Sequence, residues 1–334
     1  MSAFINGITS YLPNSVLDNV ELAAKFPEWT EEKIYLKTGI KERRIAGKNE
    51  CASDLAFHAA SALFDSGACK SSDIDAIVLC TQSPDYVLPT TACLLQHRLG
   101  ISTHALAFDF NLGCSGYIYG LGICKGLLET GQASSVLLLT ADTYSKYVGD
   151  DDQSVRTLFG DGATATYISN QKLDTGLCLN ITGPFEYGTD GSGGTNLIVE
   201  NSGSIKDESK NRSQMCNLYM NGPEIFTFTL RVIPTLITNL LKKANLSMDD
   251  IDLYVFHQAN QYLLDHLRKK LKIPSEKFAL SLEMTGNTVS STIPIVLEAY
   301  QDRIEFCNAK KVMLVGFGVG YSWGGVIIDR VTLR

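Results

Sequence analysis

The sequence lacks the patterns that mark several large classes of protein. No apolar run approaches the roughly 18 residues of a membrane span, and residues 1–7 contain no charged stretch followed by an apolar core. We therefore expect neither a membrane helix nor a signal peptide. Positive charge is in deficit, since 29 Lys and Arg stand against 36 Asp and Glu and give a net charge of −7. This balance argues against a nucleic-acid-binding surface.

The nine cysteines also lack the arrangements that would give them a structural role. They contain no CxxC pair, and their spacing to the five histidines does not suit a metal site. Their number is odd and most lie in apolar segments, which indicates reduced thiols in a cytoplasmic protein. We expect no metal, no redox cofactor and no disulfide framework.

What the sequence does contain is an alternation of apolar strands and helical patterns. The runs at 76–80, 136–140 and 312–315 are typical of buried parallel strands. Helical patterns cover 52–66 and 89–99. This alternation predicts a layered α/β fold, and 334 residues suffice for one large or two ordinary domains.

The second half of the chain repeats the order of the first. Residues 250–258 echo 73–82 apart from one residue of slippage, and a helix predicted from 286 to about 304 precedes the strand at 312. We interpret this as an internal duplication, with an N-terminal half over 1–175 and a C-terminal half over 176–334. The segment 188–214, rich in Gly, Ser and Asn, is expected to be an exposed loop, either a plain linker or a lid.

Cys114 is the candidate nucleophile. It follows the apolar run 105–108 and begins a glycine-rich helical pattern. The free N–H groups and the dipole at a helix N-terminus lower the pKa of a thiol, and the same N–H groups can hold an oxyanion. The alternative is a buried structural cysteine.

His257 and Asn287 are the candidate partners of Cys114. His257 directly follows an apolar strand pattern, and functional groups of α/β sheets gather at the carboxyl ends of strands. Asn287 lies at the predicted counterpart of the Cys114 turn, although helix capping alone would explain an asparagine there. Cys, His and Asn together suit chemistry on thioesters. A papain-like protease uses the same residue types, but its cysteine signature is absent.

The joint order of six motifs resembles one known family. The motifs are Thr38-Gly39-Ile40 with Arg43-Arg44-Ile45, the cysteine turn at 111–116, Phe159-Gly160-Asp161-Gly162-Ala163, His257-Gln258-Ala259-Asn260, Gly286-Asn287-Thr288 and the glycine-rich run at 316–324. Across its whole length the chain resembles a β-ketoacyl-acyl-carrier-protein synthase III of the thiolase superfamily. The resemblance implies a thiolase-like, internally duplicated fold of five layers, α-β-α-β-α, and a homodimer without a cofactor.

The resemblance also implies a reaction. Cys114 would take an acyl group from acyl-CoA, malonyl-acyl-carrier protein would enter next, and His257 and Asn287 would hold its thioester carbonyl during decarboxylation. The acyl steps would use an oxyanion hole formed by the backbone N–H of Cys114 and of the 318–320 region. The product would be a β-ketoacyl thioester.

For substrate or CoA binding, the resemblance points to a further set of residues: Lys37, Leu88, Arg156, Phe226, Asn260 and Tyr321. Lys37, Gln153 and Tyr262 stand where the family often has arginine, and Leu88 stands where phenylalanine is frequent. The smaller residue at 88 suggests a bulkier primer and, taken with the segment 81–86, a divergent branch of the family. The basic pair Arg268 and Lys269 is either a docking site for an acidic carrier protein or a solvated helix face.

Other functions fit the sequence less well. A degradative thiolase would need a second cysteine near the C-terminal glycine run, and an elongating synthase would have a second histidine in place of Asn287. A catalytically silent subunit would be expected to lose the cysteine or histidine. An acyltransferase that moves the acyl group to an alcohol or amine stays open as the alternative.

Overall fold

A computed structural model describes residues 2–173, 176–200, 202–205 and 217–331. Its strands form two half-sheets that share one hydrogen-bonded order, β12-β13-β14-β8-β1-β7-β6-β4-β5, with β9 paired to β14. The N-terminal half-sheet contains β1 (Phe4–Tyr11), β4 (Ala76–Cys80), β5 (Leu106–Phe110), β6 (Ser135–Asp142) and β7 (Gly162–Ser169). The C-terminal half-sheet contains β8 (Leu179–Asn180), β9 (Phe185–Thr189), β12 (Leu253–Phe256), β13 (Lys311–Gly318) and β14 (Ser322–Arg330).

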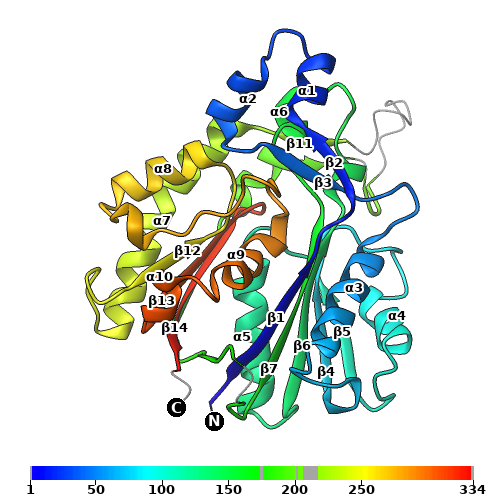
Figure 1. Ribbon diagram of the computed structural model, residues 1–334, viewed down its shortest axis with the longest axis vertical. Coiled ribbons are helices and arrows are strands. Elements are labelled where there is room, and N and C mark those ends of the chain that lie inside the picture. Colours follow the sequence, from blue (N-terminus) through cyan, green and yellow to red (C-terminus); the bar gives the residue numbers. More distant parts are fainter. Residues whose placement is uncertain (1, 174–175, 201, 206–216, 332–334) are drawn as a thin grey trace.

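Helices cover both outer faces and fill the space between the half-sheets (Figure 1). The central layer consists of α5 (Gly116–Glu129) and α9 (Thr292–Tyr300), each of which contacts strands of both half-sheets. One outer layer contains α3 (Ala52–Asp65) and α4 (Thr91–Arg98), and the other contains α7 (Gly222–Ala244) and α8 (Gln261–Lys270). A short helix, α10 (Ile304–Asn308), follows α9. The five predicted layers are therefore present.

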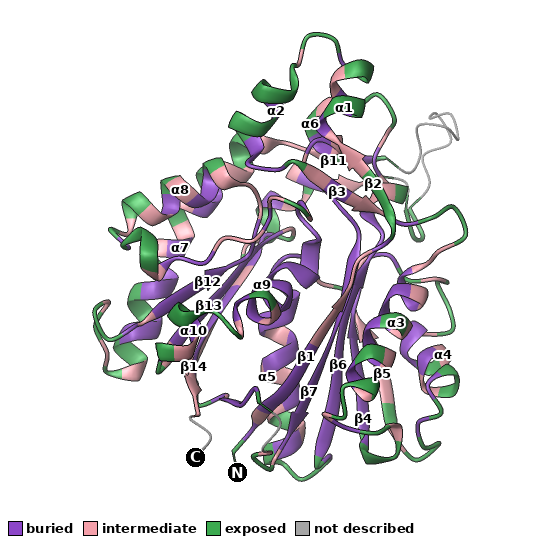
Figure 2. Cartoon of the chain, viewed as in Figure 1, coloured by how far each residue is buried: buried purple, intermediate pink, exposed green. Residues whose placement is uncertain are grey.

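Burial follows these layers (Figure 2). Every residue of β4, β6 and β7 is buried, as the continuous apolar or small-residue runs predict for strands covered on both faces. Two of the buried clusters lie beneath the outer helices, and a third surrounds α5 and α9. The functional turns that precede α5 and α9 are thus anchored in the central core.

The strand pairings repeat between the two halves. β4 pairs parallel with β6, which pairs antiparallel with β7, and β12, β13 and β14 repeat this pattern. The helices α5 and α9 each begin immediately after a serine N-cap, Ser115 and Ser291. The predicted boundary between the halves, at residue 175, falls on 174–175 and lies outside the described residues.

The repeat corrects one prediction. The helix expected from residue 286 begins only at Thr292, after a 3-10 turn over Val289–Ser291. Because Ser115 and Ser291 are equivalent caps, the counterpart of Cys114 is Ser290 and not Asn287. The turn delays the helix because Val289 has a left-handed backbone, with φ of 56°, which cannot continue a right-handed helix.

A small subdomain covers the ends of the sheets nearest the functional turns. It contains β2 (Ser15–Asp18), α1 (Asn19–Lys25), α2 (Glu31–Thr38), β3 (Glu42–Ile45) and α6 (Gln153–Arg156). The stretch expected to be an exposed loop, 188–214, is exposed over 202–205 but departs from that prediction at β10. β10 (Leu197–Val199) pairs with β11 (Leu218–Met220), and Leu197 is buried. Residues 201 and 206–214 of that stretch lie outside the described residues.

Among the described helices, only α7 is long and apolar enough to cross a membrane by length and composition. It carries Pro234 in its interior and contacts β14, β9 and β13 with its apolar side. These contacts explain the high hydropathy of α7, because the helix covers one face of the sheet.

Candidate active site

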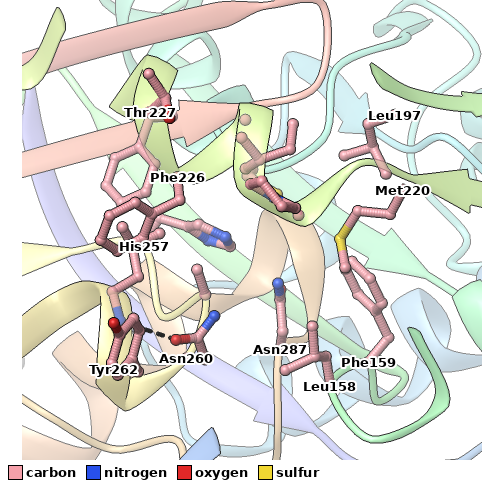
Figure 3. A pocket seen from close by; sticks show the side chains of 18 residues that line it. Leu158, Phe159, Leu197, Met220, Phe226, Thr227, His257, Asn260, Tyr262 and Asn287 are labelled. Carbon is pink, nitrogen blue, oxygen red and sulfur yellow. Dashed lines mark hydrogen bonds between the residues drawn. The ribbon is translucent and has the colours of Figure 1, made fainter. Parts of the chain in front are cut away.

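A cavity of about 430 Å³ joins the three predicted residues Cys114, His257 and Asn287. Figure 3 shows His257 and Asn287 directed into it, with Phe226 and Tyr262 on one side and Phe159 and Met220 on the other. None of the described residues that line it is Asp, Glu, Lys or Arg. The cavity therefore suits an uncharged, mostly apolar group that must reach Cys114.

Cys114 lies between the end of β5 and the N-cap of α5. Its side chain packs against Gly318 at the end of β13, where an added Cβ would lie 3.0 Å from Sγ. Glycine at 318 therefore leaves the space that the sulfur occupies. Burial raises the pKa of the Cys114 thiol to about 12, and the nearby Asp142 carboxylate adds to this rise. The expected lowering of the pKa at the helix start is thus opposed by desolvation, and the thiol needs a base when it reacts.

His257 follows β12 directly, as predicted, and its backbone N–H donates to the carbonyl of Val315 over 2.8 Å. Its Nδ1 lies 2.7 Å from the Thr292 hydroxyl, and its ring meets the edge of Phe317. Burial lowers the pKa of His257 to about 3. The imidazole is therefore neutral at physiological pH, with Nδ1 engaged and Nε2 left for the cavity.

Asn287 is held by backbone contacts with the segment before β7. Its N–H donates to the carbonyl of Leu158 over 2.9 Å, and its own carbonyl accepts from the N–H of Gly160 over 3.0 Å. The side-chain Oδ1 accepts from the N–H of Val289. Because this bond uses the amide oxygen, the Nδ2 donor is left facing the cavity. The N-cap of α9 is Ser291, so Asn287 does not cap that helix.

Glycine is required beside Asn287. Gly286 has φ of 67°, and a Cβ there would lie 2.8 Å from the Leu158 carbonyl oxygen. The Gly286-Asn287 pair thus follows from a left-handed turn that presses against a neighbouring backbone.

The predicted binding residues divide into two groups. Phe226 and Asn260 line the cavity, and Asn260 also caps α8 by accepting from the N–H of Leu263. Tyr321 is buried outside the lining and stacks on Phe228. Leu88 is 79% exposed and lies outside the cavity of its own chain.

Lys37 and Arg156, the two basic residues expected to bind CoA, each interact with another side chain of the protein. The Lys37 ammonium lies 4.5 Å from the centre of the Trp29 ring, and Arg156 pairs with Asp150 over 3.1 Å. Neither lines the cavity. These partners reduce the support for direct contacts of Lys37 and Arg156 with CoA phosphates.

The basic pair on α8 also divides. Arg268 donates to the carbonyl of Ile273 and is partly buried, so it stabilises the end of α8. Lys269 is exposed and makes no such contact among the described bonds. Of the pair, Lys269 is the better candidate for docking.

Several site residues were missed from the sequence. Thr292 orients His257, and Leu197 and Met220 wall the cavity from β10 and β11. Nothing in the sequence marks Thr292, which is one of six consecutive β-branched or serine residues, 288–293. Within the described chain no group of three or more His, Cys, Asp and Glu is arranged to hold a metal ion.

Comparison with known proteins identifies the family. Two family models match, 3-oxoacyl-[acyl-carrier-protein] synthase III over residues 108–191 and its C-terminal model over 241–330. The β-ketoacyl-[acyl-carrier-protein] synthase III of Clostridium perfringens is 37% identical over 96% of this chain and 97% of its own length. That of Caldanaerobacter subterraneus is 36% identical over 98% of each chain.

Solved structures agree with the sequence matches. A crystal structure of 3-oxoacyl-(acyl-carrier-protein) synthase III is 50% identical, covers 98% of this chain and all of its own, and has a TM-score of 0.92. The synthase III from Pseudomonas aeruginosa is 30% identical, with a TM-score of 0.88 and full coverage of both chains. The fold is thus the predicted thiolase-like one, and the chain is an enzyme that belongs to the 3-oxoacyl-[acyl-carrier-protein] synthase III family.

Proposed function

We propose that the protein joins an acyl primer from acyl-CoA to malonyl-acyl-carrier protein, with Cys114, His257 and Asn287 as its catalytic residues. The observation that carries the residue assignment is their convergence on one cavity without charged side chains. Family membership supports the reaction, decarboxylating Claisen condensation, over simple acyl transfer to an alcohol or amine. The named substrates of the relatives supply the carrier protein as partner.

In the first half-reaction the Cys114 thiol loses its proton and its sulfur attacks the thioester carbonyl of the primer. The C–S bond to CoA breaks, and the CoA thiolate takes up a proton as it leaves. Because His257 is neutral, one of its ring nitrogens is unprotonated and can accept the thiol proton. The backbone N–H of Cys114 and of the 318–320 region would hold the oxyanion.

In the second half-reaction the malonyl group loses carbon dioxide, and the electron pair of that C–C bond becomes an enolate. His257 Nε2–H and Asn287 Nδ2–H would donate to the enolate oxygen. The enolate carbon then attacks the acyl-Cys114 carbonyl, a C–C bond forms and the Cys114 thiolate leaves and is reprotonated. The products are a β-ketoacyl-carrier protein, CoA and carbon dioxide.

Thr292 can support both roles of His257. Its hydroxyl can accept from Nδ1–H while donating to the Val289 carbonyl, 3.2 Å away, which leaves Nε2 as a base. Alternatively the hydroxyl can donate to Nδ1, which makes Nε2–H a donor. One rotating hydroxyl therefore satisfies either tautomer.

Further assignments rest on the exposed surface. Val87 and Leu88 are 92% and 79% exposed, and β5 is the edge strand of the sheet order. An unpaired edge beside exposed apolar side chains favours a homodimer, in which Leu88 would reach the cavity of the partner.

Lys269 would contact the acidic carrier protein. Seven of the described cysteines, at positions 51, 69, 80, 93, 114, 124 and 307, are free thiols, which supports a reducing, cytoplasmic setting.

The test separates loading from condensation. The enzyme is mixed with a panel of acyl-CoAs and then with malonyl-carrier protein, and intact-protein mass spectrometry follows the mass on Cys114, with Cys114→Ala as the control. We expect an acyl adduct that is released as a carrier-bound β-ketoacyl product. An adduct that malonyl-carrier protein leaves untouched would contradict condensation.

Replacing Asn287 by Ala tests its assignment as a donor. Loss of one oxyanion donor lowers decarboxylation by about 10²-fold to 10³-fold, while acyl loading of Cys114 should stay within a few-fold of wild type. Carbon dioxide release and adduct mass measure the two steps. Asn239→Ala, on the exposed side of α7, is the matched control. Equal loss of both steps would place Asn287 in the scaffold instead.

A further inference from the structure

Asp142, at the end of β6, is a fully buried carboxylate that the reaction above does not use. Its Oδ1 accepts from the backbone N–H of Gln82 over 2.8 Å. Its Oδ2 accepts from the hydroxyl of Ser290 over 2.5 Å and, more weakly, from the N–H of Ser290 over 3.4 Å. The Asp142 carboxylate therefore links the turn after β4 to the turn before α9.

Gln82 connects Asp142 to the turn that contains Cys114. The Gln82 amide donates to Asn111 Oδ1 over 2.9 Å and accepts from the Tyr144 hydroxyl over 2.5 Å. It packs so closely on Gly113 that a side chain at 113 would overlap it. Gln82 thus forms the support behind the turn from Asn111 to Cys114.

The Ser290 side reaches the asparagine. Ser290 follows Val289, whose left-handed backbone is strained for a β-branched residue and whose N–H donates to Asn287 Oδ1. A strained turn persists only where its surroundings hold it. The bonds from Ser290 to Asp142 are well placed to hold this one, and with it the direction of the Asn287 amide.

The duplication shows what is particular about this pair. Ser290 is the structural counterpart of Cys114, since each precedes a serine N-cap. Asp142 and Gly318 are likewise counterparts, since each ends the corresponding strand, β6 or β13. In one half Gly318 makes room for the sulfur of Cys114, and in the other half Asp142 binds the hydroxyl of Ser290. Asp142 and Ser290 take no part in the reaction, and their hydrogen bond holds two turns together.

We propose that Asp142 is a positioning residue of this active site, whose carboxylate fixes the turn of Cys114 through Gln82 and the turn of Asn287 through Ser290. This inference deepens the proposed function and rests on it for the roles of Cys114 and Asn287. The titratable groups that face Asp142 are Cys80 from β4, Cys114, Tyr144 and Asp161. Because the negative charge of Asp142 adds to the rise in the pKa of Cys114, its removal has a readout that a purely structural role lacks.

The test compares Asp142→Asn, Ser290→Ala and the matched control Asp161→Asn. Asp161 is also a buried carboxylate, but its hydrogen bonds come from Ser145 and the N–H of Ala46 and from neither of the two turns. Alkylation of Cys114 by iodoacetamide is followed by mass spectrometry across the range of thiol titration, with Cys114→Ala to subtract the other cysteines. Acyl loading and condensation are measured on the same proteins.

We expect Asp142→Asn to move the alkylation profile of Cys114 down by about one pH unit and to slow condensation about tenfold or more. Ser290→Ala, which keeps the charge, should slow condensation similarly without that downward shift. Asp161→Asn should leave the profile unmoved. A folded Asp142→Asn with an unshifted profile and condensation within twofold of wild type would overturn the proposal.

Two further outcomes also decide between the proposal and its failure. If Asp142→Asn does not fold, as judged by circular dichroism, undiminished condensation in Ser290→Ala overturns the proposal and a tenfold loss supports it. If wild type loads an acyl group but never condenses, the proposed function fails separately, and the alkylation shift still decides whether Asp142 acts on Cys114.

Discussion

At the scale of single residues, the environment of His257 fixes its protonation more than its sequence position does. An ordinary histidine has a pKa near 6.5 and would be partly charged in the cell. Burial beneath Phe317, with no carboxylate among its bonded partners, lowers the pKa of His257 to about 3. A neutral ring can exchange donor and acceptor roles, which a charged ring cannot.

This environment predicts how His257 titrates. Because its pKa lies far below the ordinary value, the ring stays neutral as the pH falls from about 8 to about 5. Nitrogen-15 NMR of labelled histidine should show one imidazole that does not shift over this range, and His257→Gln should remove that signal. His266, exposed on α8, serves as the internal control. A His257 midpoint near 6.5 would contradict the burial argument.

At the scale of elements, α5 shows how a helix between two sheets depends on its glycines. A Cβ on Gly116 would overlap the Cys80 sulfur of β4, whereas Gly126 has open space where its Cβ would lie. The first glycine permits close packing beneath Cys114, and the second only weakens the helix.

Opposite effects of alanine at these two positions are expected. Gly126→Ala should stabilise the protein by about 0.5–1 kcal/mol, because alanine has the higher helix propensity. Gly116→Ala should destabilise it by about 1–3 kcal/mol through overpacking. Denaturant unfolding measures both, and Cys80→Ala added to Gly116→Ala should recover part of the loss. Similar stability of the two alanine variants would refute the packing argument.

The α8 helix carries the docking prediction. Lys269→Glu should raise the KM for malonyl-carrier protein by about tenfold at low salt, because charge steers association, and the effect should fade as salt rises. Turnover of a malonyl thioester without the carrier should be unchanged. Lys242→Glu, in the last turn of α7, is the matched control. An equal effect from both variants would remove the docking role of Lys269.

At the scale of the whole molecule, the exposed edge of the sheet and the apolar segment at 86–88 lie on the N-terminal half-sheet side. Tyr86, Val87 and Leu88 are each at least 60% exposed, which is unusual for three consecutive apolar side chains. A second copy would cover them and pair the β5 edge.

Light scattering after gel filtration should therefore give about twice the 36.5 kDa mass of the chain. Leu88→Glu should shift the protein toward the monomer, because it places a charge in the apolar contact. Leu36→Glu, at a leucine of α2 that is 72% exposed, is the control and should leave the mass unchanged. A wild-type monomer at micromolar concentration would rule out the dimer.

Much of this molecule is determined by local sequence. The strands at 76–80 and 136–140 and the helix at 52–66 were predicted within two residues, because continuous apolar runs and 3.6-residue periodicity report burial directly. Cys114 and His257 could be found because each follows a strand pattern, and the end of a strand is visible in the sequence. The neutral cavity around them could not be found in that way.

The tertiary structure decided what depends on contacts between distant segments. Asn287 does line the cavity, as predicted, but the reason for predicting it was wrong. It is not the counterpart of Cys114, because the left-handed Val289 delays α9 and makes Ser290 that counterpart. Leu197 comes from the stretch 188–214, which reads as a loop. Its strand β10, like β11 with Met220, has too few residues to show a period. Burial in the folded chain sets the pKa values of Cys114 and His257. The sequence by itself determined the elements and the reactive side chains, and packing between the halves determined how those side chains are charged and directed.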